Sequence, residues 1–250
     1  MSLNPNICII IPCYNEGANF RMKEYTDFIA AHPEVYLCFV NDGSKDNTLE
    51  TLVSLQKKFL QQIHISHDSI NVGKAEAIRR GAMYCEEHVR TDYYAYLDAD
   101  LAVSLEECLA MKSHLNESIE FCCASRILKL GSEIKRSRVR FFISRVFATL
   151  ISELLEIKVY DTQCGCKVFD RKLIKTLFEQ PFVSTWLFDV ELFFRILIKY
   201  DRKNGSEKML EIPLKRYVDP GDSKVKMSYF FHMFSEMLKI KRRYRSSVQD

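Results

Sequence analysis

The alternation of apolar and polar segments predicts a strand-and-helix repeat over the first hundred residues. Continuous apolar runs recur four times, and a segment with helical spacing follows each of the first three. The predicted strands fall within residues 6–16, 34–42, 62–66 and 92–100. Runs that are apolar throughout are typical of strands buried on both faces. We therefore predict an α/β fold, a mostly parallel sheet flanked by helices, with ligands at the carboxyl ends of its strands.

The predicted helices carry this pattern into the second half of the chain. The first three helices extend to His32, over about 46–62 and over 71–89. A fifth strand at 119–126 precedes a long helix at 138–157, whose apolar residues recur at helical spacing. No linker, low-complexity segment or repeat of solenoid length divides the chain. This continuity predicts a single domain.

The fourth predicted strand ends in two carboxylates, Asp98 and Asp100. Residues two apart on a strand share a face, so the two carboxylates would converge and repel each other. One interpretation is a helix cap, in which Asp100, or Ser104 followed by Glu106 and Glu107, begins the next helix. The other is a divalent cation, Mg²⁺ or Mn²⁺, which carboxylates hold together with substrate phosphates. These residues alone leave both interpretations open.

Charge is distributed unevenly along a chain of ordinary globular composition, with 250 residues, 47% hydrophobic and 28% charged. The stretches 126–145 and 224–245 each contain seven Lys or Arg against one Glu. Together they carry +12, and the remainder carries −9 of the formal total of +3. A nucleic-acid groove, an anionic membrane surface and a phosphate-bearing substrate each use such basic patches, and a solvated basic face is the plain alternative.

Cysteine usage indicates a reducing compartment. The nine cysteines are an odd number, several lie inside apolar runs, and no secretory signal precedes them. Cys164 and Cys166 lack a second pair at zinc-ligand spacing, so buried thiols are favoured over zinc. The sequence contains no run of 18 or more apolar residues, the length needed to span a bilayer. We expect a cytoplasmic protein.

The standard glycine-rich nucleotide motifs are missing from the sequence. No GxGxxG follows the first strand, which argues against a dinucleotide fold, and no GxxxxGK[ST] is present, which argues against a P-loop enzyme. The remaining interpretation is a nucleotide site in which acidic side chains bind base and ribose while a metal binds the diphosphate. That arrangement is typical of a sugar-nucleotide transferase.

Four ordered segments resemble the family 2 glycosyltransferases: "IPCYNE", "VNDGSKDNT", "NVGKAEAIRRGA" and "DADLA". Later segments, "DTQCGCKVFDR" and "WLFDVEL", resemble the polyprenyl-phosphate sugar transferases, above all the dolichyl-phosphate β-glucosyltransferases and next the mannosyltransferases. The resemblance implies the GT-A (nucleotide-diphospho-sugar transferase, Rossmann-like) fold. It also implies one domain, 1–250, with a nucleotide-sugar half at about 6–125 and an acceptor half at about 126–250.

The same resemblance implies roles for individual residues. The nucleotide would contact Pro12, Tyr14, Glu16, Asp42, Gly73, Lys74 and Asp98. The metal would be held by Asp98 and Asp100. The acceptor phosphate would meet Arg126, Arg140, Ser144 and, at either substrate's phosphates, Ser223 and Lys224. Mannosyltransferases of this family add a glutamine ligand where this chain has Ala102, so water or phosphate must complete the coordination here.

The expected reaction is inverting transfer of a hexose, glucose from UDP-glucose, to a polyprenyl or dolichyl phosphate. An ionised phosphate needs no general base, so Asp189, which hydroxyl-using relatives keep as a base, would orient the sugar or a loop. One alternative is a family 2 transferase to a saccharide hydroxyl in surface-polysaccharide assembly, with Asp189 as base. Another is a non-catalytic protein that binds nucleotides or nucleic acid.

Apolar residues accompany both basic stretches. Phe141 and Phe142 lie in one, and Phe230 and Phe234 lie in the other. Basic amphipathic helices of this kind lie on anionic membranes, although such faces also pack into protein cores. With the lipid-phosphate resemblance, they lead us to expect peripheral binding at the inner face of the membrane and no nucleic-acid partner.

Overall fold

The computed structural model describes residues 7–135, 138–218 and 227–249, with the backbone alone at 135, 138–140 and 227–231. A seven-stranded sheet forms its centre, in the order β3-β2-β1-β4-β7-β5-β8. Its strands are β1 (Ile7–Cys13), β2 (Val35–Asp42), β3 (Ile63–Asp68), β4 (Tyr93–Leu97), β5 (Phe121–Ser125), β7 (Cys166–Asp170) and β8 (Met209–Pro213). Only β7 runs antiparallel to its neighbours, β4 and β5. The predicted α/β class and mostly parallel sheet are confirmed.

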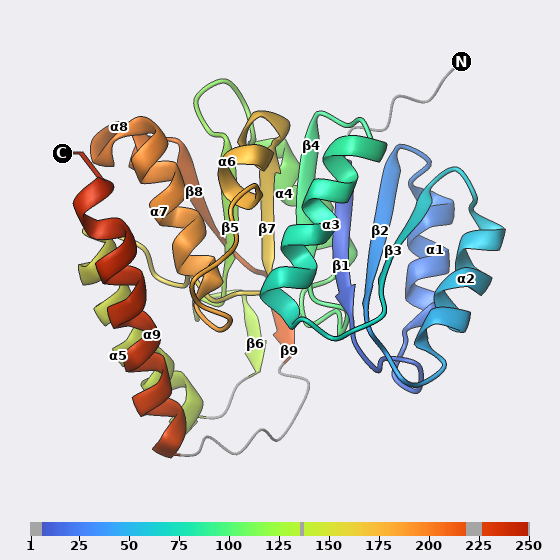
Figure 1. The fold of residues 1–250 in the computed structure, drawn as a ribbon, viewed down its shortest axis with the longest axis horizontal. Helices are drawn as coiled ribbons and strands as arrows, with labels where there is room; N and C mark the ends of the chain where they lie inside the picture. The colour runs from blue at the N-terminus through green and yellow to red at the C-terminus, as the bar shows by residue number, and fades with distance from the viewer. Residues whose placement is uncertain (1–6, 136–137, 219–226, 250) are drawn as a thin grey trace.

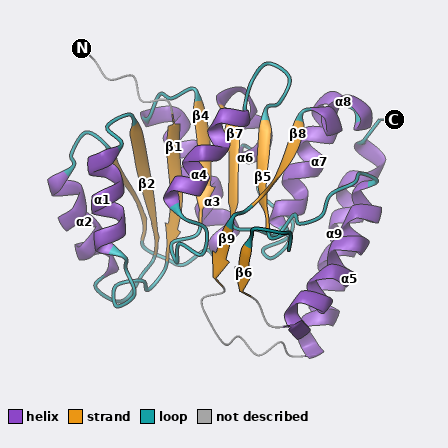
Figure 2. Ribbon diagram, turned by 180° about the vertical axis from the view of Figure 1, so that it is seen from behind, coloured by secondary structure: helices purple, strands orange, loops and turns teal. Residues whose placement is uncertain are grey.

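Helices cover both faces of this sheet, because its strands are apolar on both sides (Figures 1 and 2). One face is covered by α1 (Met22–Ala31), α2 (Thr48–Lys58) and α4 (Leu105–Met111). The other is covered by α3 (Lys74–His88), α5 (Arg138–Leu155), α6 (Ile174–Phe178), α7 (Phe188–Tyr200) and α9 (Met227–Tyr244). The short α8 (Arg202–Glu207) leads from α7 into β8.

Two long helices from the second half of the chain lie side by side. Figures 1 and 2 both place α5 and α9 next to each other, at the end of the molecule far from β1–β3. A small parallel ribbon, β6 (Glu133–Lys135) and β9 (Arg216–Val218), lies below the main sheet in Figure 1. Of the helices described, none combines the length and apolar character that crossing a membrane requires.

Two predicted element boundaries were wrong. The first helix begins at Met22, because the backbone of residues 15–17 bonds instead to the side chains of Ser44, Asp46 and Thr48. The fourth strand ends at Leu97, so Asp98 and Asp100 lie in the turn after it rather than on a strand face. Buried thiols are confirmed, since all nine cysteines are free and buried.

Candidate functional site

A pocket of about 380 Å³ lies at the carboxyl ends of β1, β2 and β4, beside the start of α3. These strands are parallel, so their ends share one edge of the sheet, the lower edge in Figure 1. The pocket is lined by Pro12, Cys13, Tyr14, Glu16, Asp42, Asn71, Gly73, Lys74, Asp98, Ala99 and Asp100. The structure thus brings together every residue predicted to bind the nucleotide or the metal.

The turn after β4 contains the carboxylate pair, and a different residue caps the helix that follows. The Leu101 N–H bonds the Asp98 carbonyl at 3.2 Å, and the Ala102 N–H bonds Asp100 Oδ1 at 2.9 Å. Ser104, not Asp100, caps α4, because its Oγ accepts the Glu107 N–H at 3.1 Å. Helix capping therefore does not account for the two aspartates.

Negative charge accumulates in the pocket. Burial, followed by the charge of Asp100, raises the pKa of Glu16, and burial and Asp98 raise the pKa of Asp100. Lys74 Nζ lies 2.6 Å from Asp98 Oδ1. Burial alone would lower the pKa of Lys74, but the carboxylates, Asp98 first, raise it overall. One ammonium shares the pocket with four carboxylates, those of Glu16, Asp42, Asp98 and Asp100, so the pocket favours a further cation.

Gly165 fixes the position of the Asp98 carboxylate. A Cβ at Gly165 would lie 2.1 Å from Asp98 Oδ2 and 2.4 Å from its Cγ, so any other residue there would displace the Asp98 carboxylate. The Gly165 carbonyl also accepts the Asp98 N–H at 3.1 Å. Gly165, in the "DTQCGCKVFDR" segment quoted above for its resemblance, therefore packs directly against Asp98.

Asp42 lines the pocket but already has partners in the protein. Its carboxylate accepts the Val72 N–H at 2.7 Å, the Gly73 N–H at 2.9 Å and the Asn71 side-chain amide at 3.0 Å. These bonds fix the loop that leads into α3. The sequence did not single out Asn71, although its position two residues before the "GK" pair was visible. A bond from Asp42 to base or ribose stays a prediction.

The donor atoms fit a hard divalent cation that binds together with a substrate. Asp98 and Asp100 supply carboxylate oxygens, which Mg²⁺ and Mn²⁺ prefer. Over the described ranges, no group of three or more His, Cys, Asp or Glu side chains is placed to hold a metal ion. Ala102 has no side-chain oxygen to add. The remaining ligands would have to come from water and the diphosphate.

Asp189 lies in a buried network beside this pocket, not in it. Its Oδ1 accepts a hydrogen bond from the Tyr96 hydroxyl and pairs with Lys167 Nζ, and its exposure is 5%. Lys167 is fully buried and also donates to the carbonyls of Thr162 at 2.8 Å and Cys164 at 2.5 Å. The network ties the loop before β7 to the start of α7. Burial and the adjacent Asp189 carboxylate raise the pKa of Tyr96 well above its usual range.

The residues predicted to bind the acceptor phosphate do not form one described cluster. Arg126 makes a two-point ion pair with Asp161, at 2.6 and 2.8 Å, and this arginine lowers the pKa of Asp161 to about 2 against the opposing effect of burial. Ser144 Oγ donates to the Phe141 carbonyl at 2.8 Å on α5. The side chains of Arg140, Ser223 and Lys224 lie outside the described residues. All five assignments stay predictions.

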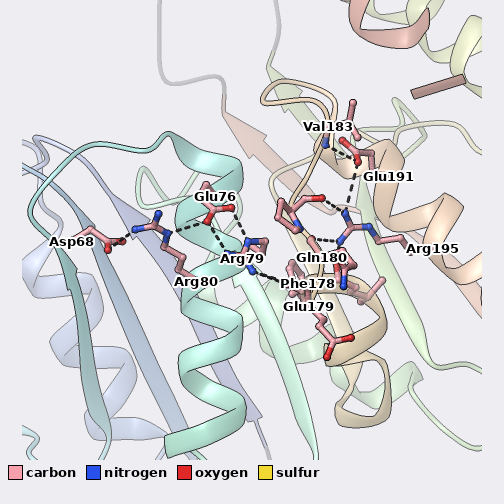
Figure 3. A network of polar contacts seen from close by, with 12 residues as sticks. Asp68, Glu76, Arg79, Arg80, Phe178, Glu179, Gln180, Val183, Glu191 and Arg195 are labelled. Carbon is pink, nitrogen blue, oxygen red and sulfur yellow. Dashed lines mark hydrogen bonds and ion pairs between the residues drawn. The ribbon is translucent and has the colours of Figure 1, made fainter. Parts of the chain in front are cut away.

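Two arginines and a glutamate hold the segment 178–187, which connects α6 to α7 (Figure 3). Arg195 donates to the carbonyls of residues 177, 180 and 181, and Glu191 accepts the N–H groups of residues 183 and 184. From α3, Arg79 reaches the carbonyls of residues 178 and 179 at 3.3 Å each. Trp186 in this segment is half exposed, and its ring lies 5.7 Å from that of His232 on α9.

Two charged residues that pair with predicted site residues were not named from the sequence, Lys167 and Asp161. Lys167 carried a readable signal, because a lysine inside the apolar run "CKVF" must find buried partners. Asp161 carried none, since its pairing with Arg126 joins residues 35 positions apart.

Comparisons with known proteins identify a family and a fold. Residues 8–178 match the family model described as glycosyl transferase family 2. The chain is 28% identical over 247 residues to a dolichyl-phosphate beta-glucosyltransferase of Trichomonas vaginalis, covering 94% of this chain and 72% of the relative. It is 28% identical over 222 residues to the dolichyl-phosphate beta-glucosyltransferase of Homo sapiens, covering 80% and 67%.

A solved structure with the same fold is glucosyl-3-phosphoglycerate synthase from Mycobacterium tuberculosis, in complex with Mn²⁺, UDP and glucosyl-3-phosphoglycerate. The TM-score is 0.66 at 15% identity, over 98% of this chain and 81% of that one. At this identity the likeness concerns the fold.

Proposed function

Because the chain belongs to glycosyl transferase family 2, we propose that it is an inverting, metal-dependent transferase that moves glucose from UDP-glucose to a polyprenyl phosphate such as dolichyl phosphate. The GT-A fold expected of such an enzyme is confirmed by the solved structures that share it. One observation carries the proposal: Asp98, Asp100 and Lys74 converge in a single pocket at the carboxyl edge of the sheet.

The relatives support the choice of substrates. Two dolichyl-phosphate beta-glucosyltransferases align with most of this chain. The synthase that shares the fold was solved with UDP and Mn²⁺. A UDP-sugar donor and Mn²⁺ or Mg²⁺ as the cation follow from these likenesses and from the oxygen ligands in the pocket.

In the proposed reaction an acceptor phosphate oxygen attacks the anomeric carbon, the bond to the nucleoside diphosphate breaks, and the configuration at that carbon inverts. Asp98 and Asp100 would hold the divalent ion, which offsets the charge growing on the leaving diphosphate. Lys74 at the start of α3 would contact the same phosphates, where the helix N-terminus adds partial positive charge. Tyr14, exposed at the pocket edge, would lie against the nucleotide.

The burial of Asp189 favours a phosphate acceptor over a saccharide hydroxyl. A hydroxyl acceptor needs a general base within reach of its proton. Asp189 is 5% exposed and already binds Lys167 and Tyr96, so it is poorly placed for that task. A phosphate is already ionised near neutral pH and needs no such base.

We place the enzyme at the membrane surface through α5 and α9. On α5 the exposed apolar residues Phe142, Val146 and Leu150 recur every four residues, so they form one stripe along the helix. On the neighbouring α9, Phe234 and Leu238 are exposed in the same spacing. A polyprenyl phosphate presents its head group at the membrane surface, so these helices would dock beside the acceptor. The proposed location is the cytoplasmic face.

The decisive test of the reaction is transfer of radiolabelled sugar to lipid. The purified protein is incubated with labelled UDP-glucose, MnCl₂ or MgCl₂, and dolichyl or undecaprenyl phosphate, and the mixture is then partitioned into organic solvent. We expect label in the organic phase, and its loss when EDTA replaces the metal. Label that stays in the aqueous phase with every lipid phosphate, but moves to an added saccharide, would support the hydroxyl acceptor instead.

Vesicle flotation tests the membrane surface. We expect Phe142→Asp to reduce binding to vesicles that contain phosphatidylserine by about tenfold. The change removes an aromatic side chain that would insert into the membrane, and it adds a negative charge that the anionic lipid repels. Leu60→Asp is the matched control, since Leu60 is 72% exposed, as Phe142 is at 71%, but lies at the far end of the molecule after α2. Equal loss in both variants would contradict docking through α5.

A further inference from the structure

The Lys74 ammonium occupies a position that a metal ion would also need. Its Nζ lies 2.6 Å from Asp98 Oδ1, and both side chains line the same pocket. A Cβ at Gly165 would lie 2.1 Å from Asp98 Oδ2 and 2.8 Å from Oδ1, so the carboxylate packs closely against Gly165, and Lys74 is the cation that reaches its buried Oδ1. An ammonium and a divalent ion would therefore compete for one carboxylate.

The pocket offers a metal little else in protein ligands. Asp100 Oδ1 already accepts the Ala102 N–H, and the described residues include no cluster of three or more metal-ligating side chains here. A metal that arrives alone would have to displace Lys74 from Asp98 and would gain only two protein carboxylates. A metal that arrives with a diphosphate gains phosphate oxygens as well.

Lys74 can exchange partners without moving its helix. Its side chain is 44% exposed, and it is the first residue of α3, where the helix N-terminus attracts phosphate. The backbone of α3 is anchored two turns further on, where Arg80 binds Asp68 at 2.7 Å and Arg79 reaches the segment after α6 (Figure 3). The side chain can turn from Asp98 to an entering diphosphate while the helix stays in place.

We propose that Lys74 is a placeholder for the metal: it neutralises Asp98 in the free protein, moves to the diphosphate when the nucleotide enters, and so makes divalent-metal binding depend on the nucleotide. The inference rests on the proposed function, because it needs a nucleoside diphosphate as the ligand. It extends that function by assigning one residue to the coupling between donor and metal, which is reciprocal by linkage.

The test measures Mn²⁺ binding by electron paramagnetic resonance and calorimetry, without any turnover. In the free protein we expect Lys74→Met to bind Mn²⁺ about tenfold more tightly than the unaltered chain, because no ammonium has to be displaced. UDP should strengthen Mn²⁺ binding much less in Lys74→Met than in the unaltered chain. Lys74→Gln repeats the change with a polar side chain, and Lys58→Met removes an exposed lysine at the far end of α2 as the charge-matched control.

The outcomes separate the placeholder from the reaction. Unchanged or weaker Mn²⁺ affinity in both Lys74 variants, or the same strengthening by UDP as in the unaltered chain, overturns the placeholder. The transferase reaction would still be judged by the organic-phase assay. Tighter Mn²⁺ binding in Lys58→Met as well would assign the effect to net charge and also overturn it.

Discussion

The two halves of the sheet treat their charged residues in opposite ways. At the ends of β1, β2 and β4, four carboxylates share a pocket with a single lysine, and burial and mutual repulsion raise the pKa of Glu16 and Asp100. Around β5 and β7, the charges are paired with each other, as in Arg126 with Asp161 and Lys167 with Asp189.

The difference shows what the charged residues contribute in each half of the sheet. Unbalanced charge in the first half opposes folding slightly and favours a cation and a ligand. Paired charges in the second half hold loops in place, because a buried charge that loses its partner is strongly unfavourable. We therefore expect substitutions in the first half to reduce activity, and those in the second half to reduce stability.

The largest effect should come from Asp98→Asn. Loss of one carboxylate charge from the metal position should lower glucosyl transfer by at least about 10³-fold, while the melting temperature stays the same or rises. Transfer to lipid and thermal unfolding measure the two quantities. Asp92→Asn is the control, because Asp92 is exposed at the opposite end of β4. A stable Asp98→Asn enzyme that keeps its full rate would remove the metal from the mechanism.

Lys167→Met tests the second half of the sheet, where we expect a loss of stability. It leaves the Asp189 carboxylate buried without its cation, so the free energy of unfolding should fall by about 3 kcal/mol. Urea unfolding measures this loss, with the exposed Lys175→Met as control. In the double variant with Asp189→Asn, the loss should be smaller than the sum of the single losses by at least about 1 kcal/mol. Simple additivity would mean that the two residues do not stabilise each other.

Two glycines compare the halves directly. Gly165→Ala places a Cβ 2.1 Å from the Asp98 carboxylate, and this displacement should lower transfer by about 10²-fold with little loss of stability. Gly81→Ala on α3 places its Cβ 2.4 Å from Val40 Cγ2 in the core, so it should lower the melting temperature instead. The rate per folded molecule should therefore fall in Gly165→Ala, and the melting temperature should fall in Gly81→Ala. Equal loss of rate in both would show that the position of Asp98 is not the cause.

The smallest effect should be a pH dependence from the Arg126–Asp161 pair. Arg126 holds the pKa of Asp161 at about 2 in the folded protein, below the value of about 3.9 in an unfolded chain. The stabilisation is therefore complete above about pH 5 and is lost as the pH falls towards 2. Between pH 6 and 2.5, urea unfolding should show a decrease about 2 kcal/mol larger in the unaltered protein than in Asp161→Asn. Parallel curves would contradict the pairing.

Sequence patterns predicted the first half well, because its chemistry follows from local order. Strands that are buried on both faces end in polar residues, and parallel strands bring those ends to one edge, so the polar residues at the ends of β1, β2 and β4 could be placed together in advance. Pro12, Gly73 and Lys74 were named from the family resemblance alone. The error lay at the strand end. Asp98 was placed on the strand face, but its N–H bonds Gly165 from a distant segment, and this contact is not visible in local pattern.

The second half resisted prediction because its contacts join distant residues. The antiparallel strand β7 follows β5 after 40 intervening residues and inserts between β4 and β5, and no local periodicity predicts that position. The ion-pair partners of Arg126 and Asp189 are Asp161, just before β7, and Lys167, on β7 itself. A basic residue could be expected to meet phosphate, but whether another side chain reaches it first depends on the whole topology.

The segment before α7 gives the protein an optical label of its own. Trp186 is the single tryptophan of the chain, and its indole meets His232 of α9 edge-on while half of it faces solvent. Intrinsic fluorescence from this protein therefore reports on one junction, between the loop held by Arg195 and the helix that we place at the membrane. A lipid that covers this junction will shift the emission to shorter wavelengths, and the shift can be followed in real time without any attached dye.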